Sequence, residues 1–97
     1  MALFKELITD FGQPVTYHRI GCVHYYHDHG VDHEEIAHID VHSYYNQAAR
    51  ENGYPPADQR QLSFTGENCP FSPDNITMAA AYAAVKTDER YADAQDV

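Results

Sequence analysis

Histidine is the residue type that could carry chemistry in this chain, because all seven histidines lie between His18 and His42. Imidazole is the commonest metal ligand in proteins and the only side chain whose ordinary pKa lies between pH 5 and 8. The window is therefore a metal site, a pH-sensitive surface, or a polar strand face built with histidines. A pH switch also needs an element with two stable states, and the sequence contains no sign of one.

A metal site would draw on the histidines of a hairpin and its acidic loop, where imidazole and carboxylate ligands can meet. The candidate ligands are His24, His27, His29, His33 and His38. The segment from His33 to His38 is not a zincin motif, because the second histidine comes one residue too late for one helix face. The metal hypothesis therefore stays open as an alternative, without a known motif behind it.

Other reactive residues give little support for catalysis. Cys22 and Cys69 are too few for a disulfide scaffold, and we expect two reduced thiols in a cytoplasmic product. Cys22 and His24 could form a thiol–imidazole pair, but a spacing of two residues on a strand arises often by chance. No serine lies in a nucleophile elbow and no glycine-rich phosphate loop occurs, so we predict neither an enzyme nor a cofactor.

The elements that must position these residues follow from hydrophobic periodicity. Alternation predicts strands over residues 3–9, 15–26, 36–45 and 59–65, and alanine-rich sequence predicts a helix over 76–86 with its start near Asp74. Residues 46–50 favour a helical turn. The fold class predicted is α+β: an antiparallel β-meander of about four strands with a C-terminal α-helix packed on one face. We expect a single domain over 1–97, with a hairpin core (15–45), a helix (74–86) and an acidic tail (87–97).

The two strongest strands also predict their own register. Opposite residues of an antiparallel pair share a face, so the apolar positions match when paired residue numbers sum to 62. This register sets His24 beside His38, Ile20 beside His42 and Cys22 beside Asp40. One face then carries Tyr17, Val23, Tyr25, Ala37, Ile39, Val41 and Tyr45, and the other carries His18, His24, His38 and His42.

Charge excludes two classes of partner. The formal net charge is −9, from 15 acidic and 6 basic residues, so phosphate backbones and anionic lipids would repel the chain. No apolar run has the length of a membrane span and no basic leader precedes an apolar stretch. We therefore expect no nucleic-acid and no membrane partner, while mimicry of nucleic acid by the acidic surface stays a weaker alternative.

Several segments resemble a set of small structural proteins of tailed bacteriophages and prophages. The resemblance rests on Tyr17-His18-Arg19-Ile20, Val41-His42-Ser43-Tyr44 leading into Ala48-Ala49-Arg50, Ala79 to Lys86, and Tyr91 to Val97. It implies a virion component of the tail, baseplate or fibre-attachment region, made in the host bacterial cytoplasm. It also implies contacts with other virion or tail proteins in a homo-oligomer, and it carries no catalytic residue.

The first hypothesis is therefore a non-enzymatic structural protein that acts through protein–protein contacts, and the alternative is a histidine-rich metal-binding module. Tyrosine combines a large contact area with a hydrogen bond, which suits it to interfaces. The contact residues predicted are Tyr25, Tyr26, Tyr44, Tyr45 and Tyr54.

Overall fold

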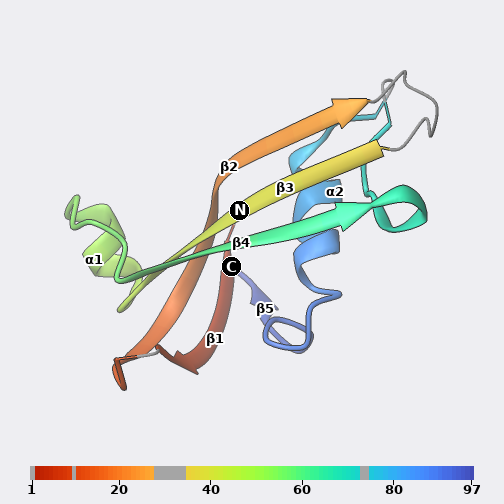
Figure 1. Cartoon of the computed structure of the whole chain (residues 1–97). Helices are drawn as coiled ribbons and strands as arrows, with labels where there is room; N and C mark the ends of the chain where they lie inside the picture. Colours follow the sequence, from red (N-terminus) through yellow and green to blue (C-terminus); the bar gives the residue numbers. More distant parts are fainter. Residues whose placement is uncertain (1, 10, 28–34, 73–74) are drawn as a thin grey trace.

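The computed structural model describes residues 2–9, 11–27, 35–72 and 75–97, which form one antiparallel sheet with a helix on one face (Figure 1). The elements are β1 (Leu3–Ile8), β2 (Pro14–His27), β3 (Glu35–Tyr44), α1 (Gln47–Glu51), β4 (Asp58–Thr65), the 3-10 turn η1 (Gly66–Asn68), α2 (Met78–Val85) and β5 (Gln95–Asp96). The strand order is β4-β3-β2-β1-β5, a meander with one added edge strand. The predicted α+β class is confirmed.

The register of β2 with β3 is confirmed in one half of the hairpin and wrong in the other. Cys22 pairs with Asp40 and His24 with His38, as predicted, but Ile20 pairs with Val41 instead of His42. A bulge between Ile20 and Cys22 explains the difference, because it adds one residue, Gly21, to β2 alone. His18 consequently lies on the buried face, and the predicted surface of four histidines is not formed.

The core lies between the inner face of β3 and the helix α2. Ala37, Ile39 and Val41 alternate along β3 and are almost fully buried. The buried side chains of α2 are Ala81, Tyr82, Ala84 and Val85. The predicted start of the helix was wrong, since Ile76 is exposed and lies before the helix. The helix starts at Met78 because the side chain of Thr77 caps it by accepting a hydrogen bond from the Ala80 N–H (3.1 Å).

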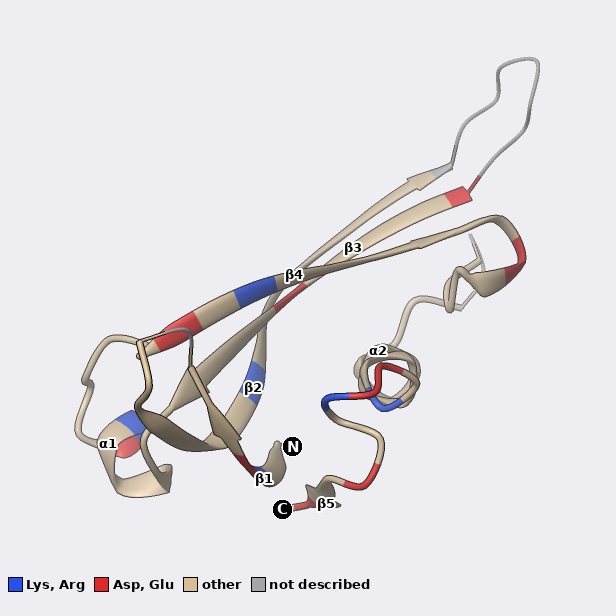
Figure 2. Ribbon diagram, turned by 60° about the horizontal axis from the view of Figure 1, so that its bottom comes forward, with Lys and Arg blue, Asp and Glu red and all other residues tan. Residues whose placement is uncertain are grey.

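The acidic tail, predicted to carry no strand, turns back and closes one edge of the sheet. Tyr91 is fully buried in the core, and β5 pairs with β1 at the positions of Leu3 and Phe4. Reciprocal backbone hydrogen bonds between Ala2 and Val97 (3.1 and 2.9 Å) fix the last residues. The chain ends therefore lie together, beside each other at the β1–β5 edge (Figure 2).

The helical turn predicted over 46–50 is α1, which follows β3. Its N-cap is Asn46, whose side-chain oxygen accepts a hydrogen bond from the Ala49 N–H (2.7 Å). The buried Ala49 holds this short helix against the protein. No helix among the described residues is long and apolar enough to cross a membrane.

Candidate functional site

The predicted metal ligands are only partly brought together. His24 and His38 are directly opposite each other on β2 and β3, on the sheet face away from α2. His29 and His33 lie outside the described residues, and His27 ends β2 with a side chain that the structure does not describe. The described part of the predicted five-histidine site is thus a single cross-strand pair.

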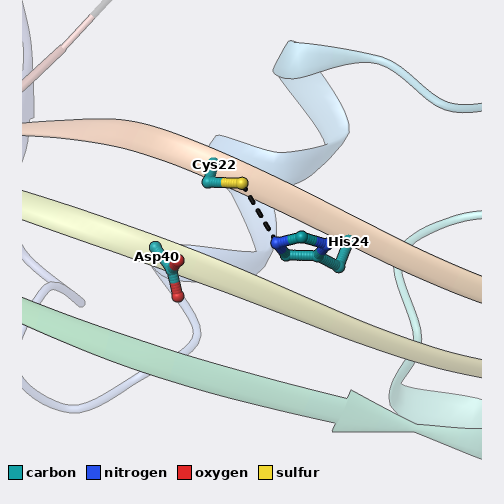
Figure 3. A group of neighbouring side chains, drawn as sticks. All are labelled: Cys22, His24 and Asp40. Carbon is teal, nitrogen blue, oxygen red and sulfur yellow. Dashed lines mark hydrogen bonds between the residues drawn. The ribbon is translucent and has the colours of Figure 1, made fainter.

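A different triad lies beside that pair: Cys22, His24 and Asp40 (Figure 3). Cys22 and His24 are two residues apart on β2 and so share a face, while Asp40 is the cross-strand partner of Cys22. The Cys22 Sγ is 3.2 Å from the His24 Nε2. One donor atom from each of the three side chains lies within 4.8 Å of the other two.

Thiolate, imidazole and carboxylate together are a donor set that suits Zn²⁺. With metal–ligand bonds of about 2.0–2.3 Å, two ligands of one ion are at most about 4.6 Å apart, so small side-chain rotations close this triad around an ion. His24 is exposed and the other two side chains are half-buried, so an ion would be accessible to solvent. Three protein ligands would leave a fourth position for water.

Aromatic and hydrogen-bond contacts orient the two imidazoles of this face. The Tyr26 ring is parallel to His24, with centroids 6.5 Å apart, and meets His38 edge-on at 5.9 Å. The Nδ1 of His38 is 2.9 Å from the Ser63 Oγ on β4. His38 is thereby tied to β4, while the Nε2 of His24 is directed toward Cys22.

His18, predicted on the histidine face, is instead a fully buried side chain with two short hydrogen bonds. Its Nε2 is 2.7 Å from the carbonyl oxygen of Lys5, and its Nδ1 is 2.7 Å from the Ser43 Oγ. A carbonyl only accepts, so Nε2–H donates to Lys5 and the Ser43 hydroxyl donates to Nδ1. Burial lowers the pKa of His18, although the bond to Lys5 opposes this effect.

The two hydrogen bonds of His18 together join β1, β2 and β3, and Ser43 is also buried. The Tyr91 ring packs edge-on against His18 at 5.4 Å. Sequence reasoning missed the contact, since it placed His18 on the outer face. The signal available was Gly21, because glycine inside a strand marks a bulge.

The predicted contact tyrosines fall into two groups. Tyr26, Tyr45 and Tyr54 are exposed, and their role in contacts stays a prediction. Tyr44 is 9% exposed, and Tyr25 packs edge-on against Phe71 at the margin of the core. Burial and the neighbouring Glu35 carboxylate raise the pKa of Tyr25. Tyr44 therefore offers little area to a partner, while Tyr25 is half-buried and its role in contacts stays a prediction.

Sequence reasoning also missed the groove beside β4. An open pocket of about 620 Å³ lies between the end of β4, η1 and α2. Its apolar lining includes Phe64, Ala80, Ala83 and Ala84. In the described sheet no strand pairs with the outer side of β4, so this groove adjoins unpaired backbone at the end of β4, over Ser63, Phe64 and Thr65.

Comparisons with protein-family models, curated proteins and solved structures find no match for this chain. Functional inference therefore depends on the residues and their geometry.

Proposed function

We propose that this protein is a non-enzymatic assembly protein that extends its sheet by accepting a strand along the outer side of β4. The observation that carries the proposal is the form of that edge. β4 has eight residues and pairs with β3 in unbroken register, from Ser43 and Asp58 to Ile36 and Thr65. Edge strands that avoid pairing use proline, lysine, bulges or short length. β4 contains no proline, lysine or bulge, and its two charged residues, Asp58 and Arg60, lie at its start and form an ion pair with each other (3.4 Å).

The groove beside β4 supplies what an added strand needs on the covered side of the sheet. Side chains alternate between faces along a strand, so every second residue of an added strand would point toward α2. There the small side chains of Ala80, Ala83 and Ala84 leave room for it. Backbone hydrogen bonds then supply affinity and the groove supplies selectivity, as in other complexes formed by strand addition.

A second copy of the chain fits this edge. Antiparallel pairing of β4 with itself about Leu62 sets Gln61 opposite Ser63 and Arg60 opposite Phe64 of the other copy. No like charges are then opposed, although each chain has a net charge of −9. The resemblance to tailed-phage proteins supports a place for this assembly in the tail, baseplate or fibre-attachment region of a virion.

The proposal is tested by light scattering over a range of concentrations. Wild-type protein is expected to form a defined oligomer. The Gln61→Lys/Ser63→Lys variant adds two positive charges to the edge of each copy and is expected to be monomeric. The control, Ala92→Lys/Gln95→Lys, adds the same charge at exposed positions near the other edge and should keep the wild-type mass. A monomeric wild type, or equal dissociation of the control, would contradict self-assembly through β4.

Metal binding at Cys22, His24 and Asp40 is the second candidate function, supported by the clustering of three donor atoms. Metal analysis of protein purified without a histidine-affinity step is expected to find one zinc equivalent per chain. Cys22→Ser should lose that metal, while Cys69→Ser, at a half-buried cysteine outside the triad, should keep it. Less than one equivalent in the wild type, or retention in Cys22→Ser, would rule this function out.

A further inference from the structure

A second pocket, of about 180 Å³, lies where β2, β3 and α1 meet. Three elements supply its lining: β2 with Arg19, Ile20 and Gly21, β3 with His42 and Tyr44, and α1 with Arg50. The lining of the pocket is polar. Apart from Ile20 and Gly21, every lining residue has a side chain with hydrogen-bonding atoms. Two of the chain's 6 basic residues therefore line this one pocket.

The two arginines of this pocket differ from the three basic side chains for which the structure gives an ion pair. Lys5, Arg60 and Lys86 each form an ion pair with an aspartate. Arg19 and Arg50 form no ion pair with any residue that the structure describes, and the pocket lining includes no carboxylate. Figure 2 shows basic positions on both β2 and α1, the elements that supply these arginines. Two arginines therefore line one pocket whose lining supplies no counter-ion.

The backbone around the pocket is fixed by local structure. The bulge leaves Gly21 beneath the His42 ring, whose atoms lie 2.2–2.5 Å from the place that a Cβ of residue 21 would occupy. Glycine is thus required for His42 to occupy this position. Helix α1 is held at its start by Asn46 and at its end by the Gly53 N–H, which donates to the carbonyl oxygen of Arg50 (3.1 Å).

We propose that this pocket binds one phosphate group. Guanidinium groups match a phosphate because they donate two parallel hydrogen bonds to its oxygens. Two such groups balance the charge of a phosphate dianion, and His42 and Tyr44 add further donors. The net negative charge of the whole chain is screened within about 8–10 Å at physiological salt, so the two nearby arginines dominate. A long polyanion such as nucleic acid would also extend over the acidic surface outside the pocket, which would repel it.

The probe for this site is inorganic phosphate, titrated at constant ionic strength against the two-dimensional NMR spectrum of the folded protein. Saturable shifts are expected in Arg19, Gly21, His42 and Arg50. Arg19→Gln and Arg50→Gln should each weaken binding about tenfold or more, the effect of losing one charge-assisted contact. Arg90→Gln removes the same charge at an exposed site outside this pocket and should bind like the wild type.

Two further titrations define the ligand. A phosphate monoester such as glycerol phosphate should bind as tightly as free phosphate if the site recognises a phosphate group at the end of a larger molecule, and more weakly if it holds the free ion. Acetate should bind at least tenfold more weakly than either. The proposal is overturned if shifts do not saturate, if acetate equals phosphate, or if Arg90→Gln weakens binding as much as Arg50→Gln.

Discussion

The two edge strands of the sheet, β5 and β4, differ in how much unpaired backbone they leave open to another strand. The edge formed by β5 is two residues long, lies next to the chain ends, and is flanked by the ion pairs Lys5–Asp93 and Lys86–Asp96. The edge formed by β4 is eight residues long and carries no pairing strand in the described sheet. Short, charged edges resist further pairing and long regular ones permit it. The proposed assembly therefore uses the β4 side of the sheet.

The closed edge also depends on the buried polar contacts of His18. His18 fastens β1 through the Lys5 carbonyl and fastens β3 through Ser43. Tyr91 packs on the same imidazole and holds the segment that leads into β5. Core substitutions should therefore lower the stability of the closed side, which contains β1 and β5. Assembly through the open edge should change only when residues of β4 itself are changed.

The largest effect is expected for His18→Ala. This change removes two buried hydrogen bonds and leaves a cavity, which together should lower the free energy of unfolding by about 3 kcal/mol. Urea unfolding measures this loss, and amide exchange should become faster in β1 and β5 than in β4. His24→Ala is the matched control on the exposed face and should cost less than about 0.5 kcal/mol. Equal losses for both variants would contradict the distinction between the two faces.

The closed side is also expected to weaken in acid. The pKa of His18 is lowered from 6.5 by burial, so the unfolded chain takes up a proton near pH 6.5 while the folded protein does not. The contribution of His18 is therefore complete above pH 6.5 and falls as the pH drops toward its folded pKa, by up to about 1.4 kcal/mol per pH unit. The free energy of unfolding of wild type and of His18→Gln, compared from pH 8 to 5, measures this contribution of His18. If the difference in the free energy of unfolding between wild type and His18→Gln stays constant from pH 8 to 5, the prediction is refuted.

Two tyrosine-to-phenylalanine changes test the packing beneath the sheet. The Tyr82 hydroxyl accepts a hydrogen bond from the Ile20 N–H (3.1 Å), so Tyr82→Phe should cost about 1 kcal/mol. The Tyr91 hydroxyl is buried with no hydrogen-bond partner among the described residues, so Tyr91→Phe should be neutral or stabilising by up to about 1 kcal/mol. Thermal unfolding of both variants measures the difference, and the opposite order would show that Tyr91 has a partner.

The smallest effect is expected at the ion pair between Lys86 and Asp96 (3.4 Å) beside β5. The Asp96 side chain is exposed and the Lys86 side chain is 32% exposed, so Lys86→Gln should change the free energy of unfolding by less than about 0.5 kcal/mol. The change should disappear in high salt. A larger effect that persists in salt would mean that this pair, and not the core beneath it, closes the β5 edge.

The sequence predicted most strands and half of the hairpin register, and the failures have physical causes. Apolar alternation correctly paired Cys22 with Asp40, and so placed two members of the metal triad together. It could not show the extra residue at Gly21, which reverses the face of His18. It also could not predict β5, whose two exposed residues have no pattern of their own.

Amide hydrogen exchange at low and high protein concentration tests assembly through β4 most directly, because it reports on both edges in one experiment. The account predicts that amides of β4 exchange more slowly as concentration rises, while those of β1 and β5 do not change. It also predicts that Gln61→Lys/Ser63→Lys abolishes this added protection. Concentration-independent exchange in β4, or new protection at β1 and β5 instead, would contradict the account.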